Sequence, residues 1–519
     1  MKEFAYHRLL LPAADRMGGK IGVIDGEHRV TYAEHVDRVF RLSQSLRKDL
    51  GMNRGDRFAV MALNSHRYLE LYHASFLGAG VINPLNLRLS PKELAFILAD
   101  SGCRVCFTDF VFAGLIDSVR KEAGIETVVL LGEGPDAPHD ASYEALVDGA
   151  SADEPEEPEE TDPVILMYTG GTTGLPKGVV IDSRALFIDA YKVATRFAMD
   201  EAYVYLHQTP MFHAASLGGV LCVPAVGGTT TFVPLFDPAR VLDAIEAEQV
   251  TMTVMVPTMI GMLLGHPDFR PERLASLTTL AYGASPMPTA LLQRVLDPFP
   301  DLQVYQGYGM TESCGLLTVL GPEEHRRGGQ LLRSAGRPFL GTMLSIQDPD
   351  GNVLPSGQTG EVCARSGNYM TEYWHRPEET AEVFRGGWYH TGDAGHLDEQ
   401  GYLYLVDRVK DMIVTGGENV YSAEVENAIA SHPAVEQVAV IGIPDERWGE
   451  AVHAIVVLKA GSTASEDDIK AHVRELIAGY KVPKAVEFRA EPLPLSGALK
   501  ILKRELRAPY WKGKDRAVE

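Results

Sequence analysis

Basic residues are scarce in this chain of 519 residues, relative to acidic ones. It carries 48 Lys and Arg against 70 Asp and Glu, which gives a formal net charge of −22. Nucleic acids and anionic lipid surfaces are bound by clustered positive charge, so this balance argues against both as partners. Any nucleotide that the protein binds therefore needs a cleft that is positive locally.

Cysteines and long apolar runs are also lacking. Five cysteines, an odd number spread along a long chain, do not describe a disulfide framework. Cys103 and Cys106 form a C-x-x-C pair at the strand-type run RVCFTD (104–109), where buried thiols are expected rather than a redox pair or a metal site. No apolar run of about 20 residues occurs, and the N-terminus lacks the apolar core of a signal peptide. We therefore expect a cytoplasmic protein without an integral membrane segment.

Helix-type and strand-type segments alternate from residue 28 to residue 130, which predicts a parallel sheet covered on both faces. Thr31 is placed to cap a helix that runs to Leu50, and RFAVMAL (57–63) has the composition of a strand. The acidic, proline-rich run SADEPEEPEETD (151–162) is predicted to be a solvated connector that does not pack. The alternation then resumes and continues to about residue 320.

The texture changes in the C-terminal part of the chain. Short strands interrupted by Gly, Asp and Pro predict a compact, largely antiparallel β-rich unit over residues 340–406. The last hundred residues predict a separate small α+β domain, with a helix over 422–432, strands over 435–443 and 451–460, and a helix over 466–478. The expected fold class is therefore α/β, with stacked α/β sheets, a β-rich subdomain and a small C-terminal α+β domain.

The most informative stretch is ILMYTGGTTGLPKG (165–178), in which an apolar strand-type run leads into a loop of glycines and threonines. Backbone N–H groups left bare by glycine, together with threonine hydroxyls and Lys177, form a concave site suited to phosphate oxygens. Pro176 stands where a Walker A loop needs a glycine, so the loop is not of that type. Taken alone, a glycine-rich turn between two strands is the plainer explanation.

Four further polar motifs follow along the chain, each at a turn or at a junction between predicted elements. They are YQGYGMTES (305–313), WYHTGDAG (388–395), LVDRVKD (405–411) and PLSGALKILKREL (494–506). Each has an ordinary structural explanation, because turn aspartates hydrogen-bond their own backbone and basic helices are usually solvated. Their order and spacing are far more specific than any one of them.

In this order, over residues 30–506, the motifs resemble those of the adenylate-forming superfamily of acyl-CoA synthetases, luciferases and nonribosomal-peptide adenylation domains. The resemblance implies two half-reactions. A carboxylate attacks the α-phosphate of MgATP to give an acyl adenylate and pyrophosphate, and a thiol then displaces AMP. It implies ATP, Mg²⁺ and CoA as cofactor and co-substrates, an AMP-binding domain over 1–406, a hinge over 407–410 and a mobile lid domain over 411–519.

The resemblance also assigns nucleotide contacts to residues of these motifs. They are Thr169, Gly170, Gly171, Thr172, Thr173, Gly174, Lys177, Gly283, Ala284, Ser285, Gln306, Gly307, Tyr308, Gly309, Thr311, Asp393, Arg408 and Lys500. Tyr308 would flank the adenine, and Asp393 with Arg408 would take the ribose, since a carboxylate accepts two hydrogen bonds from a diol. Thr311 would contact the α-phosphate, and Glu312 would hold Mg²⁺, a hard cation that prefers carboxylate and phosphate oxygens.

Lys500 is the predicted catalytic lysine, with Thr311, Glu312 and His213 as the rest of the catalytic set. An ammonium on a flexible stem can contact the carboxylate and the α-phosphate together and offset their repulsion. Two positions depart from the family pattern. Gly170 replaces the usual Ser or Thr, which removes a hydroxyl worth roughly 1 kcal/mol, and Leu499 replaces the usual Gly before the lysine.

The second half-reaction is implied to need rotation of the C-terminal domain about Lys410, with Gly416 and Gly417 bordering the CoA tunnel. MFHAAS (211–216) matches the segment whose histidine stands at the mouth of the acyl pocket. The predicted pocket residues are His213, Ala214, Met310, Cys314 and Leu317. Amino-acid-activating relatives carry an aspartate at the start of the MFHAAS segment, and its absence here favours an uncharged acyl group.

We therefore expect an acid–thiol ligase, an AMP-forming acyl-CoA synthetase of fatty acid metabolism that acts on a medium- or long-chain fatty acid or a bulky alicyclic acid. Alternatives within the same chemistry are an aryl- or cinnamate-type CoA ligase, an enzyme that loads a carrier protein, and one that diverts the adenylate to oxidation. A non-enzymatic alternative is a catalytically silent nucleotide or acyl-CoA sensor, against which the presence of Glu312 and Lys500 argues. The oligomeric state stays open, a homodimer included.

Overall fold

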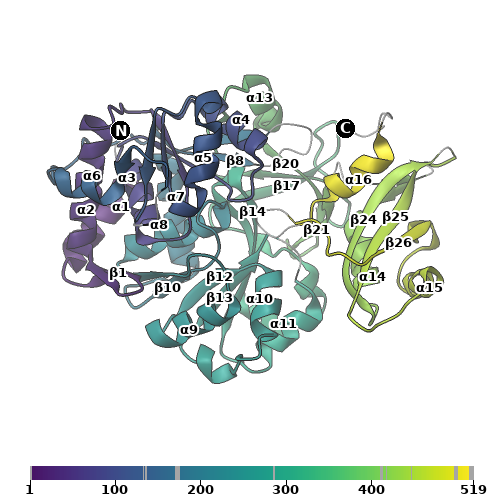
Figure 1. Ribbon diagram of the computed structural model, residues 1–519. Helices are drawn as coiled ribbons and strands as arrows, with labels where there is room; N and C mark the ends of the chain where they lie inside the picture. Colours follow the sequence, from purple (N-terminus) through teal and green to yellow (C-terminus); the bar gives the residue numbers. More distant parts are fainter. Residues whose placement is uncertain are drawn as a thin grey trace. The chain divides into compact units, whose positions relative to one another are not determined.

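The computed structural model describes residues 3–132, 134, 137–169, 176–284, 287–408, 413–415, 418–445, 447–495 and 501–512. The chain divides into two compact units, Met1–Met343 with Ser366–Glu382 and Leu344–Arg365 with Val383–Glu519 (Figure 1). The domain limits expected at 406 and 411 refer to the parts that move during the reaction, and they stay predictions. Within the described residues, no helix is both long enough and apolar enough to cross a bilayer.

The first unit is built on two mainly parallel sheets. One sheet runs in the order β16 (Arg337–Pro338), β15 (Gly315–Leu320), β14 (Gln303–Met310), β13 (Thr279–Gly283), β12 (Met252–Met255), β10 (Val204–His207), β11 (Thr229–Phe232), β1 (Ile21–Asp25) and β2 (His28–Thr31). The other runs β19 (Glu372–Tyr373), β9 (Lys177–Asp182), β8 (Pro163–Thr169), β4 (Val81–Pro84), β3 (Arg57–Met61), β5 (Val105–Thr108), β6 (Thr127–Leu130) and β7 (Ala141–Ser142). The predicted parallel sheet is confirmed by β3 to β6, whereas β2 joins the other sheet.

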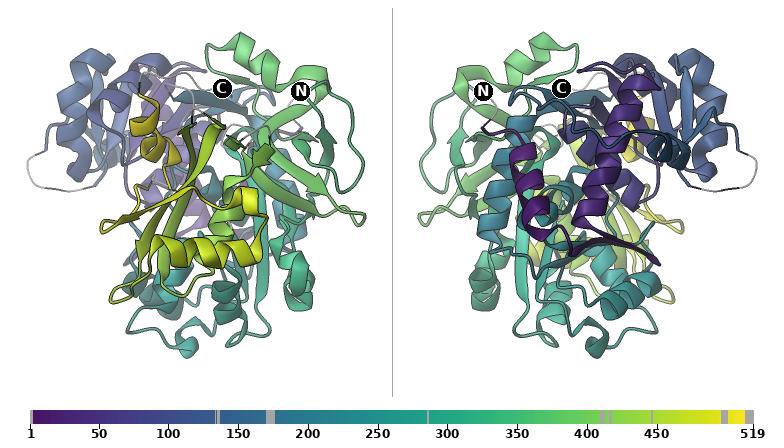
Figure 2. Two further views of the ribbon diagram at one scale, coloured as in Figure 1. Left: turned by 90° about the vertical axis from the view of Figure 1, so that its right-hand side faces the viewer. Right: turned by 90° about the vertical axis from the view of Figure 1, so that its left-hand side faces the viewer.

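Helices of the first unit cover these sheets. They are α1 (His7–Met17), α2 (Tyr32–Lys48), α3 (His66–Phe76), α4 (Pro91–Ser101), α5 (Phe110–Ala123), α6 (Tyr143–Gly149), α7 (Ser183–Arg196), α8 (Leu217–Val226), α9 (Pro238–Glu248), α10 (Pro257–Leu264), α11 (Thr289–Leu296), α12 (Pro322–Arg327) and α13 (Pro377–Val383). Figure 1 shows α9, α10 and α11 together beside β12 and β13, and the right-hand view of Figure 2 shows the purple helices α1 and α2 next to each other.

The start of α2 confirms the predicted cap. The Thr31 hydroxyl oxygen accepts from the Glu34 N–H at 3.3 Å, and the Glu34 carboxylate accepts from the Thr31 N–H at 2.7 Å. Each side chain thereby satisfies a backbone donor that the first helical turn leaves unpaired. The helix ends at Lys48, two residues before the predicted end.

The acidic run 151–162 is not the unpacked connector that its composition predicts. Pro158 and Glu160 are buried. The Glu160 carboxylate accepts from two backbone N–H groups of the N-terminal segment, at 3.1 and 3.3 Å, and Asp162 pairs with Arg54. The prediction was wrong here because these carboxylates find N–H and guanidinium partners on the first unit, which offset their desolvation.

The second unit contains two further sheets. The sheet β17 (Met343–Gln347), β18 (Gly360–Arg365), β20 (Tyr389–Leu397) and β21 (Leu403–Arg408), in which β18, β20 and β21 pair antiparallel, confirms the predicted β-rich character of residues 340–406. The other contains β23 (Glu418–Val420), β22 (Ile413–Thr415), β25 (Gly449–Leu458) and β24 (Val435–Asp445), with β26 (Ala485–Arg489) paired to β25. Its helices are α14 (Ser422–Ala430), α15 (Glu466–Leu476) and α16 (Lys503–Trp511).

Alternation along β24 and β25 explains how these helices are held. Val440 and Val456 pack into a core with α14 and α15, whereas Ile441 and Ile455 pack into a second core with Leu506 of α16. Successive side chains of a strand point to opposite faces, so a strand that is apolar at every position is buried on both.

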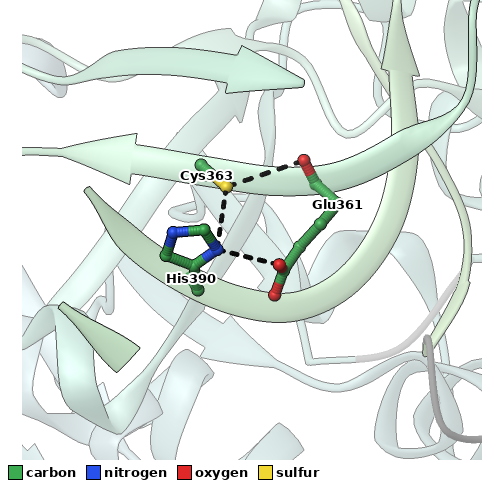
Figure 3. Close-up of side chains that lie close together, drawn as sticks. All are labelled: Glu361, Cys363 and His390. Atoms are coloured by element: carbon green, nitrogen blue, oxygen red, sulfur yellow. Dashed lines mark hydrogen bonds and ion pairs between the residues drawn. The ribbon is translucent and has the colours of Figure 1, made fainter. Parts of the chain in front are cut away.

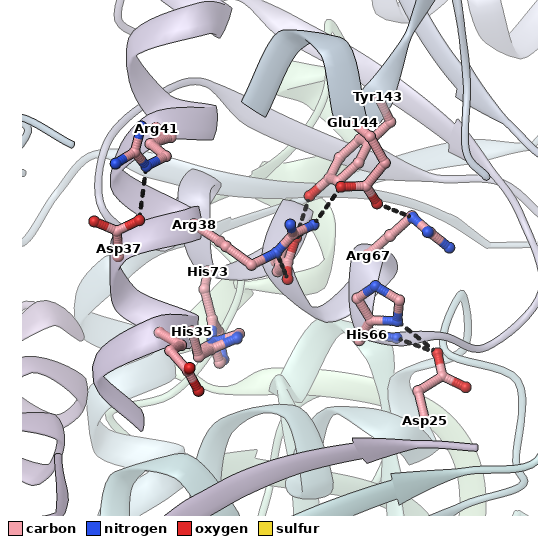
Figure 4. A network of polar contacts seen from close by, with 12 residues as sticks. Asp25, His35, Asp37, Arg38, Arg41, His66, Arg67, His73, Tyr143 and Glu144 are labelled. Atoms are coloured by element: carbon pink, nitrogen blue, oxygen red, sulfur yellow. Dashed lines mark hydrogen bonds and ion pairs between the residues drawn. The ribbon is translucent and has the colours of Figure 1, made fainter. Parts of the chain in front are cut away.

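A buried polar network joins α2, α3 and α6 (Figure 4). Arg38 donates to the Glu70 carboxylate at 2.7 and 3.1 Å and to Glu144 at 3.0 Å. The Tyr143 hydroxyl donates to Glu70 at 2.6 Å. Glu70 is fully buried, so its charge needs Arg38 and Tyr143 as partners in the interior. Loss of either of these two partners would be strongly destabilising.

Candidate active site

The predicted residues Thr311 and Glu312 lie on a rigid turn at the end of β14. β14 and β15 pair antiparallel, with Met310 opposite Gly315, and the turn between them is the 3₁₀ helix η3 (Thr311–Ser313). The Ser313 hydroxyl lies 3.0 Å from the Met310 carbonyl oxygen and 2.7 Å from that of Gly315. The turn is therefore braced from within, which fixes the direction in which its side chains leave the sheet.

Glu312 is oriented by Tyr373 of β19. The Tyr373 hydroxyl donates to Glu312 Oε1 at 2.9 Å, and the backbone N–H of Met370 donates to the Glu312 carbonyl at 2.8 Å. A fixed carboxylate is the kind of oxygen donor that Mg²⁺ accepts, and one or two such groups usually suffice when phosphates supply the rest. Glu312 thus fits the magnesium role implied by its motif.

Lys177 lies beside the same tyrosine. It begins β9 and is paired in register with Thr169 at the end of β8, so β8 and β9 are neighbouring antiparallel strands. Its ammonium pairs with Glu379 of α13 and lies 5.2 Å from the ring centroid of Tyr373. Partial burial alone would raise the pKa of Glu379, but the hydrogen bond and charge of Lys177 lower it. One aromatic ring therefore contacts both the phosphate-loop lysine and the carboxylate assigned to Mg²⁺.

Sequence reasoning missed Tyr373 and Glu379. Tyr373 reaches the site because β19 pairs with β9, opposite Val179, although about two hundred residues separate them along the chain. The strand has only two residues, which is too short for any alternation to be visible. Glu379 lies in an acidic helical segment that looks like an ordinary solvated face. Nothing local in the sequence distinguishes either residue.

The two motifs assigned to adenine are brought together by the sheet. β13 and β14 are parallel neighbours, with Tyr282 opposite Gln306 and Gly283 opposite Gly307. A Cβ at Gly283 would lie 2.4 Å from the Gly307 carbonyl oxygen, so only glycine allows this approach. Ala284 and Gln306 to Gly309 therefore lie at neighbouring strand ends, as expected for one binding slot, and contact with adenine stays a prediction.

Asp393 lies in the second unit, where β20 pairs with β21. Its backbone is in register with that of Arg408, so the two residues assigned to ribose are neighbours across the sheet. The preceding residue of β20, Gly392, has a φ of 69°, a left-handed backbone conformation that favours glycine, where the pairing with β18 is irregular. The Asp393 N–H donates to the Thr391 hydroxyl at 3.1 Å, and the side chain is buried. The Arg408 side chain lies outside the described residues.

The predicted acyl-pocket residues come from two segments of the first unit. Cys314 and Leu317 are fully buried on the hairpin that also carries Met310. His213 precedes the short η1 helix (Ala214–Ser216), and its Nδ1 accepts from the Ala215 N–H at 3.1 Å. This bond requires an unprotonated Nδ1, so His213 can donate a hydrogen bond only from Nε2.

The remaining predicted positions lie outside the described residues, and their roles stay predictions. They are Gly170, Gly171, Thr172, Thr173, Gly174, Ser285, Lys410, Gly416, Gly417 and Lys500.

Comparisons with known proteins agree with these observations. The profile of the AMP-binding enzyme family matches residues 11–374, and that of the AMP-binding enzyme C-terminal domain matches residues 424–500. A feruloyl-CoA synthase of an Amycolatopsis species is 42% identical over 490 residues, which cover 93% of this chain and 95% of that protein. The long-chain-fatty-acid–CoA ligase FadD13 of Mycobacterium tuberculosis is 38% identical over 484 residues, 93% of each chain.

Solved structures extend the likeness to the fold. ATP-bound MatB from Rhodopseudomonas palustris has a TM-score of 0.88 at 29% identity and covers 98% of this chain and 99% of its own. The anthranilate CoA ligase AuaEII in complex with anthranoyl-AMP has a TM-score of 0.89 at 26% identity, covering 98% and 97%.

A parallel α/β body with a glycine-threonine loop, followed by a small α+β unit, defines the class of adenylate-forming enzymes. Within that class, the chain belongs to the AMP-binding enzyme family. It is an ATP- and CoA-dependent acid–thiol ligase, an acyl-CoA synthetase in the broad sense that includes aryl acids.

Proposed function

We propose that this ligase activates a monocarboxylic acid whose acyl chain is uncharged and hydrophobic, and that it transfers the acyl group to CoA. The observation that supports the proposal best is the group formed by Lys177, Tyr373 and Glu312. It brings the ammonium of Lys177 over the ring of Tyr373 and the carboxylate of Glu312 to the hydroxyl group of the same tyrosine. A triphosphate with its metal needs both charges close together.

In the first half-reaction, an oxygen of the substrate carboxylate attacks the α-phosphorus and the bond to pyrophosphate breaks. Lys177 and the Gly/Thr loop hold the β- and γ-phosphates, Thr311 contacts the α-phosphate, and Tyr373 keeps Glu312 oriented. Mg²⁺ held by Glu312 supplies positive charge to the triphosphate. Lys500 bridges the two repelling anions, so its ammonium acts where negative charge accumulates in the transition state.

In the second half-reaction, the CoA sulfur attacks the acyl carbonyl and AMP leaves. The C-terminal domain pivots at Lys410, which withdraws Lys500 and brings Gly416 and Gly417 beside the thiol path. Asp393 and Arg408 keep the ribose of the adenylate in place through both steps.

Medium- and long-chain fatty acids are the leading substrate class. The pocket residues Met310, Cys314 and Leu317 are uncharged, and Cys314 and Leu317 are fully buried, which suits an acyl chain without charge. Arylpropenoic acids form a second class, favoured by the 42% identity to a feruloyl-CoA synthase.

A substrate panel tests the proposal. The protein is incubated with MgATP and saturated fatty acids, ferulate, 4-coumarate or cyclohexanecarboxylate, with and without CoA. We expect acid-dependent pyrophosphate release without CoA, and AMP release only after CoA is added. A preference for charged amino acids, or no acid-dependent signal at all, would contradict the proposal.

Lys500→Ala separates the two half-reactions. Loss of one preorganised charge contact typically costs about a hundredfold or more in rate, so pyrophosphate release should fall by that factor. Thioester formation from a synthetic acyl adenylate should persist, because the lysine acts only in the first step. Lys503→Ala, three residues away on α16, is the matched control and should keep adenylation. An equal loss of pyrophosphate release in the two variants would show that Lys500 has no specific role in adenylation.

A further inference from the structure

Three side chains of different chemistry converge on the antiparallel sheet of the second unit (Figure 3). Glu361 and Cys363 belong to β18, and Cys363 lies directly opposite His390 of β20. His390 Nδ1 is 3.3 Å from Cys363 Sγ and 2.8 Å from Glu361 Oε2. The sulfur, the ring nitrogen and a carboxylate oxygen all lie within 4.8 Å of one another. None of the three has a part in the proposed ligase reaction.

The cluster is held in place before any ion binds. Cys363 is fully buried and His390 is 7% exposed, so neither side chain has much freedom. Glu361 Oε1 accepts from the backbone N–H of Gly392 at 3.1 Å, which turns the other oxygen, Oε2, toward His390. Glu361 itself is only partly buried, so one side of the cluster is open to a water molecule as a further ligand.

We propose that Glu361 Oε2, Cys363 Sγ and His390 Nδ1 bind a thiophilic divalent cation of the zinc type. Zinc sits about 2.0–2.3 Å from nitrogen, oxygen and sulfur ligands, which places tetrahedral ligand atoms roughly 3.5 Å apart. The Nδ1–Sγ separation of 3.3 Å is already close to this value, whereas the Nδ1–Oε2 separation of 2.8 Å must open by about 0.7 Å. Three protein ligands and one open position is a common zinc arrangement.

The donor set distinguishes this cation from the magnesium of the reaction. Thiolate and imidazole suit zinc, cobalt(II) and cadmium, whereas Mg²⁺ prefers oxygen ligands. On binding, the Cys363 S–H bond breaks, the Sγ–metal bond forms and the proton passes to solvent. Magnesium should therefore not compete at this site.

Arg385 limits the affinity. Its guanidinium lies 2.9 Å from the same Oε2 of Glu361, and its side chain is 43% exposed. A cation must share or displace this partner, so removing the guanidinium by Arg385→Gln should tighten metal binding.

A cobalt titration tests the site in the full-length protein after treatment with a chelator. One equivalent of Co²⁺ should produce the ultraviolet thiolate-to-cobalt band and the visible bands of tetrahedral coordination, and Zn²⁺ but not Mg²⁺ should remove them. Cys363→Ala should abolish the thiolate band and weaken affinity at least about tenfold. Cys222→Ala, at another fully buried cysteine, is the matched control and should bind like the wild type.

Circular dichroism establishes that each variant is folded, and His390→Gln gives a second test that keeps the thiol. It should weaken cobalt binding, whereas Arg385→Gln should strengthen it severalfold. The absence of a thiolate band at saturating Co²⁺ would overturn the proposal. A band that survives in folded Cys363→Ala, or is lost in Cys222→Ala, would also overturn it.

Discussion

At the scale of single residues, the hydroxyl group of Tyr373 connects the parts of the site that sequence motifs identify separately. It donates to Glu312, and its ring lies under the ammonium of Lys177. A carboxylate that accepts a hydrogen bond from a fixed hydroxyl group is held in one orientation. In the proposed reaction Tyr373 is thus a positioning residue, since it would act on the metal and the phosphates through Glu312 and Lys177.

Tyr373→Phe should lower kcat/KM for MgATP about tenfold, since a hydrogen bond to a charged group contributes roughly 1.5–3 kcal/mol. The Mg²⁺ concentration needed for half-maximal rate should rise as well, because Glu312 loses its orientation while its charge remains. Steady-state rates of pyrophosphate release at several Mg²⁺ concentrations measure both effects. Tyr191→Phe on α7, at an exposed tyrosine, is the control. An unchanged Mg²⁺ dependence would show that the hydroxyl does not act through Glu312.

At the scale of elements, the β14–β15 hairpin decides where the η3 turn stands. Its strands approach so closely that a Cβ at Gly309 would lie 1.9 Å from the Gly315 carbonyl oxygen. No side chain can move to relieve that contact, because the clash is with backbone. Close packing of the two strands therefore requires glycine at position 309, independently of any contact with nucleotide.

Gly309→Ala should destabilise the first unit by about 3 kcal/mol, the upper range for overpacking, and should impair adenylation by shifting Thr311 and Glu312. Gly218→Ala is the matched control, because that helical glycine has open space around its Cβ position. The control should be neutral or stabilise by a few tenths of a kcal/mol. Thermal unfolding of the two variants checks the contrast. Similar unfolding temperatures would disprove the backbone clash.

Local sequence patterns predicted individual helices and strands well, but they predicted contacts between residues far apart in the sequence poorly. The cap at Thr31 and the apolar runs of β24 and β25 follow from nearest-neighbour chemistry, and both are confirmed. β19 is fixed only by its pairing with a strand far away in sequence, so no local pattern marks it. The prediction of an unpacked connector over 151–162 was wrong for the same reason. Arg54, the cationic partner of Asp162, lies about a hundred residues upstream in the sequence.

At the scale of the whole molecule, buried histidines couple folding to pH. His35 Nε2 lies 2.7 Å from His73 Nδ1 (Figure 4). His73 Nε2 lies 3.2 Å from the Val220 carbonyl oxygen. The chain of bonds requires an unprotonated His73 Nδ1, since a proton on that nitrogen would face the N–H of His35. Burial lowers the pKa of His35 and of His73 to about 3.

His207 offers the cleanest test of this coupling. Burial lowers its pKa to about 3, Nδ1 contacts the Ser216 hydroxyl at 3.0 Å, and buried Nε2 has no hydrogen-bond partner within the described part of the chain. The folded-state pKa lies below the unfolded value of about 6.5. As the pH falls below 6.5, His207 becomes protonated in the unfolded chain but not in the folded protein. The free energy of unfolding therefore decreases with falling pH.

His207→Asn keeps a polar atom near Ser216 and removes the titrating group. Between pH 7 and pH 5 the wild type should lose about 2 kcal/mol of unfolding free energy relative to this variant. Asp109, whose pKa burial raises to about 6, acts in the opposite direction but contributes equally to both proteins, so the difference between them cancels it. Urea unfolding followed by circular dichroism at several pH values gives that difference. A difference that stays constant across the pH range would mean that His207 is protonated alike in the folded and unfolded states.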